Sequence, residues 1–304
     1  MGSHLSESLL ADGWEVWGVD NFLTGRRENL EPLRRYPQFH FSRIDVSRRV
    51  PRAEVDVIYH LASPASPPRY QEHPLETLEV NSRGTARLLA HAAACKARMV
   101  LASTSEVYGD PEVHPQTESY WGHVNPVGPR SCYDEGKRFS EALSMAWRTS
   151  RGVDVRIARI FNTYGPRMDP EDGRVISNFF VQGWKGAPIT VQGTGRQTRS
   201  FCYVSDLVRG LRALAEVDRV EGPVNLGNPD TEHSILEIAE QIREITGSRS
   251  KIVRITRGRD DPERRRPDIT RARKILKWRP RVSLEEGLQL TSEYFRSVVQ
   301  GTRR

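Results

Sequence analysis

The sequence predicts an α/β fold: a doubly wound parallel sheet followed by a smaller C-terminal lobe. Two observations carry this prediction. In the first half of the 304 residues, stretches with helical periodicity alternate with short apolar stretches, which is typical of a parallel sheet covered by helices on both faces. After Asn162 this alternation gives way to a loop rich in proline, glycine and charge, and two amphipathic helices follow in the C-terminal third.

Residues 3–13 begin the alternation with an amphipathic helix that ends at Gly13, a common helix stop. A strand pattern follows and ends in Asp20, and a second short strand ends in Asp45. Residues 55–62 are an almost continuous apolar run, as expected for a strand that is buried on both faces.

The alternation continues to residue 162. Residues 77–95 have helical periodicity, and residues 98–104 form another buried apolar strand. After a long loop, we expect a helix from about Asp134 to Arg148 and a strand over residues 153–162. Because parallel strands end at the same edge of a sheet, the polar residues that follow them are expected to meet there.

The remaining chain predicts a second, smaller lobe. Residues 175–193 are expected to form a helix and a strand. A helix over residues 205–217 would return to the main sheet, with Ser205 near its start as a capping residue. The amphipathic stretches 234–247 and 283–299 complete the chain.

We therefore expect two lobes with a cleft between them. Residues 1–165, joined by about 195–228, would form a nucleotide-binding unit of the Rossmann type. Residues 166–194 and 229–304 would form the smaller, substrate-binding lobe. The cleft lies at the carboxyl ends of the strands, which makes it the expected ligand site.

Composition excludes several classes of protein. The net charge is +7, but no nucleic-acid motif accompanies it, so we expect no nucleic-acid partner. The sequence has neither an apolar run of roughly 18 residues nor a signal peptide, so we expect a cytoplasmic protein without a membrane partner. Cys95, Cys132 and Cys202 are scattered, so we expect neither a disulfide framework nor a metal site.

A tyrosine and a lysine are the first candidates for chemistry. Tyr133 and Lys137 are one helical turn apart and share a face of the predicted helix. An ammonium near a phenol lowers the phenol pKa, and the phenolate can remove a hydroxyl proton while a hydride leaves the same carbon. The strand before this helix ends near Thr104 and Glu106, where a hydroxyl could hold the reacting oxygen. An exposed Tyr and an exposed Lys are the alternative, because the spacing alone is unspecific.

Asp20 is a candidate for cofactor binding. A carboxylate at the end of this strand would accept hydrogen bonds from the ribose of adenosine, which favours NAD over its 2′-phosphorylated form. Arg26 and Arg27 weaken this preference, because an arginine there could bind a 2′-phosphate. The alternative is a strand-end aspartate that only precedes a turn.

Longer motifs make the interpretation more specific. The stretches "HLASPASPPRY", "ASTSEVYGDPEVHPQTESYWGHVNPVGPRSCYDEGKR", "RIARIFNTYGPRM" and "QTRSFCYVSDLV" resemble the extended short-chain dehydrogenase/reductase family, and within it the UDP-glucuronate decarboxylases. The resemblance extends from Gly2 to Phe295. It implies NAD-dependent decarboxylation of UDP-glucuronate to UDP-xylose through a 4-keto intermediate, with the hydride returned to the sugar, in a homodimer.

The resemblance also implies roles for individual residues. Tyr133 and Lys137 would be the catalytic pair, Thr104 would orient the reacting hydroxyl, and Glu106 would lie beside the sugar as an acid, a base or a positioning group. The residues implied at the cofactor are Gly2, Asp20, Asn21, Phe22, Thr24, Gly25, Asp45, Val46, Leu61, Ala62, Ser63 and Ala102, with Tyr133 and Lys137. The residues implied at the UDP-sugar are Asn162, Arg167, Arg174, Asn178, Arg199 and Arg265.

Two related activities are alternatives. A sugar-nucleotide 4,6-dehydratase resembles this family but carries Thr-Asp-Glu where this chain has Thr104, Ser105 and Glu106. A serine is a poor acid for expelling water, so decarboxylation is favoured. A 4-epimerase resembles the same fold but lacks the loop "ESYWGHVNP".

The third alternative is an inactive remnant that binds a nucleotide-sugar. The family pattern runs from a strand into GxxGFxGSHL and a helix, and this chain supplies the "GSHL" of Gly2 to Leu5. We therefore expect that the first strand and most of the glycine loop are absent from this chain. Such a loop presents backbone N–H groups to a pyrophosphate, so we expect reduced stability and reduced NAD affinity.

Overall fold

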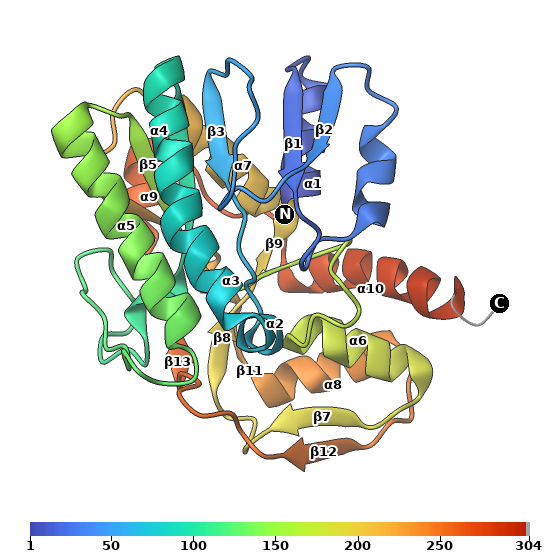
Figure 1. The fold of residues 1–304 in the computed structure, drawn as a ribbon. Helices are drawn as coiled ribbons and strands as arrows, with labels where there is room; N and C mark the ends of the chain where they lie inside the picture. Colours follow the sequence, from blue (N-terminus) through green and yellow to red (C-terminus); the bar gives the residue numbers. More distant parts are fainter. Residues whose placement is uncertain (302–304) are drawn as a thin grey trace.

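Four parallel strands make up the main sheet of the computed structural model, which describes residues 1–301 (Figure 1). Their order is β10-β5-β4-β3, and a separate parallel pair, β1 and β2, lies beside β3 (Figure 1). Among the described residues, no strand is hydrogen-bonded between β1 and β3. The strands are β1 (Val16–Asp20), β2 (Phe39–Arg43), β3 (Val57–His60), β4 (Arg98–Thr104), β5 (Val155–Ile160) and β10 (Pro223–Leu226).

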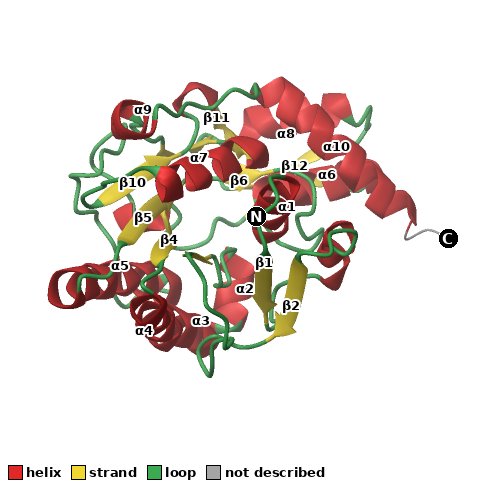
Figure 2. Cartoon of the chain, turned by 90° about the horizontal axis from the view of Figure 1, so that it is seen from above, coloured by secondary structure: helices red, strands yellow, loops and turns green. Residues whose placement is uncertain are grey.

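Side-chain alternation along β4 divides the core of the main sheet into two layers. Met99 and Leu101 pack in a cluster with the apolar residues of α4, whereas Val100 and Ala102 pack in a cluster with those of α7. A strand buried on both faces needs apolar residues at every position, which explains the continuous apolar run. The doubly wound sheet predicted from the sequence is confirmed (Figure 2). The covering helices are α4 (Thr85–Cys95), α5 (Ser131–Arg151) and α7 (Val204–Glu216).

Shorter helices connect these strands. The helix predicted over residues 77–95 consists of α3, a π-helical turn and α4 in direct succession. Leu5 and Leu10 are the buried residues of the first helix, which packs against β1 and α7. These connecting elements are α1 (Gly2–Ala11), η1 (Arg27–Leu33), α2 (Pro67–Glu72), α3 (Pro74–Glu79), η2 (Val80–Gly84) and η3 (Ser105–Tyr108).

A second group of elements lies below the main sheet in Figure 1. Helices α6, α8 and α10 pack on one another and share a core cluster with β7, which pairs with β12. These elements are α6 (Val175–Lys185), β7 (Ile189–Gln192), α8 (Ile235–Ile245), β12 (Ile252–Ile255) and α10 (Leu284–Gly301). Small strands and helices join this group to the main sheet: β6 (Thr163–Tyr164), β8 (Thr198–Ser200), β9 (Cys202–Tyr203), η4 (Pro229–Thr231), β11 (Glu232–Ser234), β13 (Arg264–Arg265) and α9 (Thr270–Leu276).

Two features differ from the sequence prediction. Helix α7 begins at Val204, and its N-cap is Tyr203 without a side-chain cap, so Ser205 does not cap it. The polar residue of its first turn, Asp206, instead accepts hydrogen bonds from the N–H groups of Arg281 and Val282, each at 2.9 Å. Strands β8, β11 and β13 were not predicted, because two or three residues are too short to display a period of two.

Helix α9 was not predicted either, and it packs on the main sheet. Ala272 of α9 and Trp278 after it lie in the core cluster that contains Val224 and Leu226 of β10. This part of the chain therefore contacts the nucleotide-binding unit, although the expected boundary placed it in the smaller lobe. The boundary itself stays a prediction.

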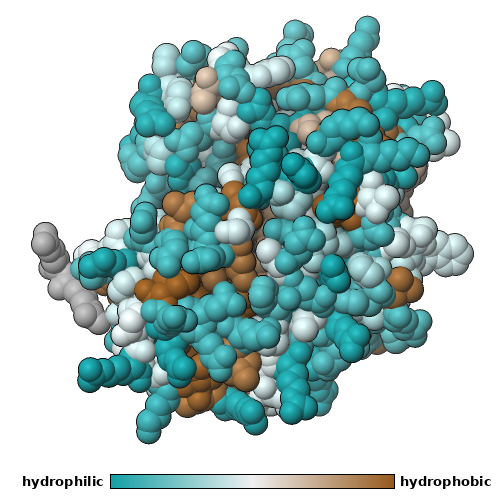
Figure 3. All heavy atoms as spheres, turned by 180° about the vertical axis from the view of Figure 1, so that it is seen from behind, coloured by the Kyte–Doolittle hydropathy of each residue, from teal (hydrophilic) through white to brown (hydrophobic). Residues whose placement is uncertain are grey.

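The surface seen from behind is mostly hydrophilic, and its apolar atoms gather on the side nearer the C-terminus (Figure 3). No helix within residues 1–301 combines the length and the apolar character needed to cross a bilayer.

Candidate active site

Tyr133 lies in a cavity of about 210 Å³ at the carboxyl ends of β4 and β5. It is in the first turn of α5, and its hydroxyl is hydrogen-bonded to the side chain of Thr104, the last residue of β4. The ring stacks on that of Tyr70, with centroids 5.0 Å apart and an angle of 3° between the planes. The start of a helix and the end of a strand thus meet at one hydroxyl, as the sequence predicted.

Lys137 lies one turn further along α5. Its Nζ donates to the carbonyl of Ala102 at 2.8 Å and is 5.9 Å from the centroid of the Tyr133 ring. Burial lowers the pKa of Lys137 to about 7. The side chain is therefore close to half-protonated at neutral pH, in a position that faces both the ring and the strand end.

The expected effect of Lys137 on Tyr133 is wrong for the chain on its own. Burial raises the pKa of Tyr133 well above its usual value, and the hydrogen bond from Thr104 only partly opposes this. Desolvation of the phenolate is the largest cause, and the charges of Glu106 and Asp134 raise the pKa of Tyr133 further.

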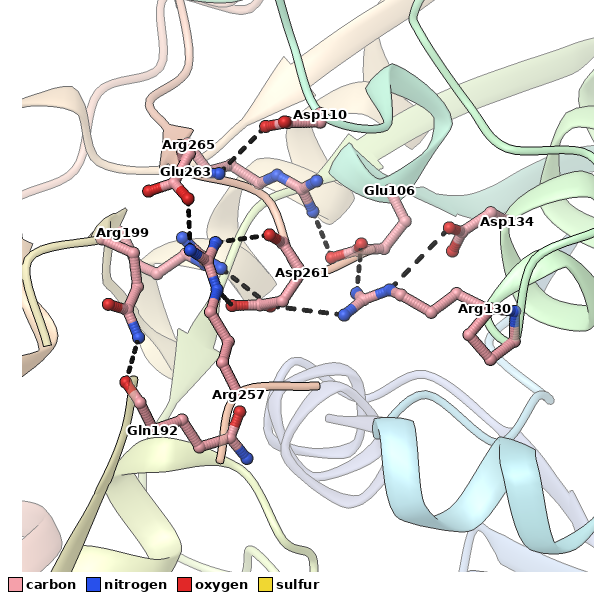
Figure 4. Close-up of polar contacts among 12 residues, drawn as sticks. Glu106, Asp110, Arg130, Asp134, Gln192, Arg199, Arg257, Asp261, Glu263 and Arg265 are labelled. Carbon is pink, nitrogen blue, oxygen red and sulfur yellow. Dashed lines mark hydrogen bonds and ion pairs between the residues drawn. The ribbon is translucent and has the colours of Figure 1, made fainter. Parts of the chain in front are cut away.

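Glu106 is held between two arginines (Figure 4). Its carboxylate pairs with Arg130 at 2.5 Å and with Arg265, which is almost fully buried. Burial alone would raise the pKa of Glu106, but the charges of Arg265 and Arg130 hold it at about 2. Glu106 is therefore ionised at neutral pH in this arrangement.

Asp134 was missed by the sequence reasoning. One of its oxygens is 3.9 Å from Nε of Arg130, and the other is buried without a hydrogen-bond partner. Burial, with the charge of Glu106, raises the pKa of Asp134 to about 8. A neutral carboxylic acid therefore lies behind the ionised Glu106. Its place directly after Tyr133 in the sequence was a signal that could have found it.

The residues predicted at the UDP-sugar divide into three groups. Arg265 lies behind Glu106, and Arg167 lies at a different cavity, where it pairs with Glu7 at 2.5 Å. The predicted residues that line the Tyr133 cavity are Asn162, Arg174, Asn178 and Arg199. Three further residues that line it, Tyr70, Arg130 and Asp261, were not predicted.

A second cavity of about 300 Å³ lies beside β1. Asp20 reaches it from the end of β1 and accepts a hydrogen bond from the N–H of Phe22 at 2.7 Å. A Cβ on Gly25 would lie 2.6 Å from Oδ2 of Asp20, so the glycine lets the carboxylate lie against the backbone. The carboxylate keeps an oxygen available for ribose hydroxyls, and these residues fit the adenosine half of NAD.

Some of the other residues predicted at the cofactor line one of the two cavities, and the rest line neither. Asp45 accepts two hydrogen bonds from Ser47, at 2.6 and 2.9 Å, and Val46 is buried in a core cluster. Asn21, Asp45, Val46 and Ala62 line neither cavity. Gly2, Asp20, Phe22, Thr24, Gly25 and Ser63 line the cavity beside β1, and Leu61, Ser63, Ala102, Tyr133 and Lys137 line the Tyr133 cavity.

Metal chemistry has no visible site in the part of the chain that the structure describes. Within residues 1–301, no group of three or more histidine, cysteine and acidic side chains is arranged to hold an ion.

A buried Tyr–Lys pair at the carboxyl edge of a parallel sheet, next to an aspartate at a strand end, defines a nucleotide-binding enzyme of the short-chain dehydrogenase/reductase class. The model of the GDP-mannose 4,6 dehydratase family matches residues 1–291. UDP-glucuronic acid decarboxylase 1 of Xenopus tropicalis is 54% identical over 300 residues, covering 99% of this chain and 70% of the relative. The corresponding protein of Danio rerio is 55% identical over 295 residues, covering 97% of this chain and 70% of the relative. The chain therefore belongs to the UDP-glucuronic acid decarboxylases of this extended family.

Sugar-nucleotide epimerases are among the solved structures with the same fold. UDP-glucuronic acid 4-epimerase of Bacillus cereus, in complex with UDP-glucuronic acid and NAD, matches with a TM-score of 0.87 at 27% identity. That match covers 98% of this chain and 96% of the epimerase. UDP-glucose 4-epimerase of Thermotoga maritima, with UDP-glucose, has the same TM-score, identity and coverage.

Proposed function

We propose that this chain converts UDP-glucuronate to UDP-xylose, with NAD as its cofactor. Relatives of the same family at 54% and 55% identity carry this activity in their names, and a structure with the same fold binds UDP-glucuronic acid and NAD. The cofactor would be held by Asp20 and Gly25 at its adenosine and by the Tyr133 cavity at its nicotinamide.

One observation of the structure carries the choice of decarboxylation. Position 105, between Thr104 and Glu106, is a serine whose hydroxyl lies 3.4 Å from Arg265, and Glu106 is ionised between two arginines. Neither side chain can protonate a departing hydroxyl at neutral pH. Loss of carbon dioxide needs no such acid, because the C–C bonding electrons pass into a ketone two carbons away.

The residues of the chain would act in sequence on the glucuronate ring. In its phenolate form, with its oxygen held by Thr104, Tyr133 would remove the proton of the C4 hydroxyl. When bound, NAD⁺ would supply the hydride acceptor for C4 and the hydride for the return step, with Asp20 and Gly25 holding its adenosine. The resulting C4 ketone takes up the electrons released by the C6 carboxylate as carbon dioxide leaves. Protonation at C5 and return of the C4 proton from Tyr133 complete the xylose product.

We also infer a homodimer and a cytoplasmic location. Large apolar side chains are exposed on two helices that pack together: Leu75 and Leu78 on α3, and Phe139 on α5. An apolar surface of this kind favours a protein interface. The three cysteines are unpaired thiols, which fits a reducing compartment.

Incubation with UDP-glucuronate and NAD⁺ tests the proposed activity. Nuclear magnetic resonance should show UDP-xylose, and a carbon dioxide assay should show release in equal amount. Tyr133→Phe is the control, because loss of turnover in this variant shows that the chain itself catalyses the reaction. Conversion to UDP-galacturonate alone would identify an epimerase. Turnover of a hexose nucleotide such as GDP-mannose, with UDP-glucuronate untouched, would identify a dehydratase, and no turnover of any of them would reject the proposal.

A further inference from the structure

Asp261 places a second carboxylate in a cavity that is proposed to take an anionic substrate. Among the described residues that line the Tyr133 cavity, the acidic ones are Glu106 and Asp261. Glu106 is explained by its place beside the reacting sugar. Asp261 lies instead on the segment 256–263, which joins β12 to β13 and contains no helix or strand. A carboxylate in a site for anions repels an anionic ligand, unless its side chain moves out of the site.

Three guanidinium groups converge on this carboxylate (Figure 4). Oδ1 of Asp261 lies 2.9 Å from Nη2 of Arg199 and 3.3 Å from Nη1 of Arg130. Oδ2 lies 3.3 Å from Nε of Arg257. The arginines come from β8, from the residue before α5 and from the segment itself, so the tertiary structure has built an anion cradle.

Arg199 depends on this carboxylate for its counter-charge. The side chain is 8% exposed, and its ion pair within residues 1–301 is with Asp261. Its other hydrogen bond is to the carbonyl of Thr198 at 2.8 Å. A buried guanidinium without an anion would be strongly unfavourable, so the cradle needs a negative charge with or without a ligand.

The backbone around Asp261 is held from outside the cradle. The carboxylate of Asp260 accepts a hydrogen bond from Asn125 at 3.1 Å, and the N–H of Glu263 donates to Asp110 at 2.9 Å. The Asp261 side chain itself is held by arginines alone. It can therefore turn away without loss of the contacts that fix its neighbours.

We propose that Asp261 is an internal counter-ion that occupies the diphosphate end of the cavity and is exchanged for the substrate diphosphate on Arg199 and Arg130. The inference rests on the proposed function for the identity of the anion. Diphosphate oxygens accept charge-assisted hydrogen bonds as a carboxylate does, so the arginines stay paired in both states. Each binding event must break the Asp261 contacts, and this lowers the affinity for the nucleotide.

Titration of UDP and of inorganic pyrophosphate by calorimetry tests this exchange. Asp261→Asn should bind both ligands about tenfold more tightly than the unchanged chain. Glu263→Gln is the matched control, because it removes the same charge from the same segment but pairs only with Arg257. Its affinities should stay within about twofold of those of the unchanged chain.

A second readout is thermal stability. Without ligand, Asp261→Asn should melt at a lower temperature, because Arg199 loses its counter-charge, and saturating UDP should restore the melting temperature of the unchanged chain. If Asp261→Asn does not fold alone, pyrophosphate during refolding should rescue it. Failure of that rescue would overturn the proposal.

Equal or weaker ligand binding by a folded Asp261→Asn would show that Asp261 supports the site and would overturn the exchange. Absence of UDP and pyrophosphate binding in both proteins would overturn it too. Turnover of UDP-glucuronate is scored separately. If Asp261→Asn binds UDP more tightly but the unchanged chain does not turn over UDP-glucuronate, the counter-ion proposal stands and the proposed decarboxylation is rejected. If the unchanged chain turns over UDP-glucuronate but Asp261→Asn binds UDP more weakly, the decarboxylation stands and the counter-ion proposal is rejected.

Discussion

At the scale of single residues, burial moves both members of the Tyr133–Lys137 pair toward their neutral forms. The phenol is made a weaker acid and the ammonium a stronger one, because charge is poorly solvated in the cavity. The same burial leaves Asp134 protonated at neutral pH, whereas two arginines keep Glu106 ionised. Four neighbouring titratable groups thus differ in charge for reasons that are local to each.

Tyr133→Phe tests the base directly. Loss of the hydroxyl should lower kcat for UDP-glucuronate by roughly 10²–10⁴-fold and leave the affinity for UDP unchanged. Tyr70→Phe is the matched control, since it keeps the stacked ring and removes a buried hydroxyl that has no described partner. It should retain more than a tenth of the activity. Comparable losses in both variants would mean that removal of a buried hydroxyl, and not loss of proton transfer by Tyr133, lowers the activity.

Lys137→Met tests the burial of the ammonium through stability. The pKa of Lys137 falls from 10.5 to about 7 on folding, so between these values the unfolded chain binds more protons and stability rises with pH. The buried charge is most costly below pH 7. Urea unfolding should therefore show Lys137→Met to be more stable than the unchanged chain at pH 6, with a difference that shrinks toward pH 10. A difference independent of pH would contradict the assignment.

At the scale of elements, α5 connects the site to the surface. Its first two turns carry Tyr133, Asp134 and Lys137 toward the cavity, while Phe139 is exposed beside α3. One helix can both line the cavity and expose an apolar side chain, because positions on the same face recur every 3.6 residues and the positions between them point elsewhere. An interface formed by α3 and α5 would therefore lie directly behind the catalytic pair.

Leu78→Glu, combined with Phe139→Glu, tests the proposed interface. A charge at each position should prevent burial of this face and convert a dimer to a monomer, as measured by light scattering after gel filtration. Leu290→Glu on α10 is the control, because Leu290 is similarly exposed at 39% but lies on another surface. The proposal fails if the double variant keeps the mass of the unchanged chain, or if the unchanged chain is already monomeric.

At the scale of the whole molecule, the four-stranded main sheet and the β1–β2 pair differ in how well their strands are covered. Strand β4 lies between β3 and β5 and is buried from Met99 onward, whereas β1 pairs with β2 alone in a two-stranded sheet. A two-stranded sheet has two edges and few neighbours to protect it.

Hydrogen exchange followed by mass spectrometry should rank these regions. Amides of residues 16–20 and 39–43 should exchange faster than those of residues 98–104 and 155–160, because local opening is easier where fewer strands pack. Peptides from α8 and α10, which share their own core cluster, provide an internal comparison. Equal protection of the two sheets would contradict the expectation.

Most regular elements of the main sheet could be predicted because their patterns are local, but the edge strand β10 was not predicted. The apolar run of β4 and the helical period of α4 are visible within the segments that form them. The short strands β8, β11 and β13 were missed because they exist only where distant segments meet. Among the cofactor predictions, Asp45 and Val46 were placed at a strand end, but a hydrogen bond to Ser47 and core packing take them out of both cavities.

The sequence by itself determined the class of fold, the family and the Tyr133–Lys137 pair, because helical spacing, strand periodicity and long motifs are properties of neighbouring residues. Only the tertiary structure decided the electrostatics of the site. Arg130, Glu106 and Asp261 come from separate parts of the chain, and their charges depend on distances of 2.5 and 3.3 Å that no local pattern encodes. Because a charge interaction is set by separation and burial, not by order along the chain, the protonation of the site emerges only on folding.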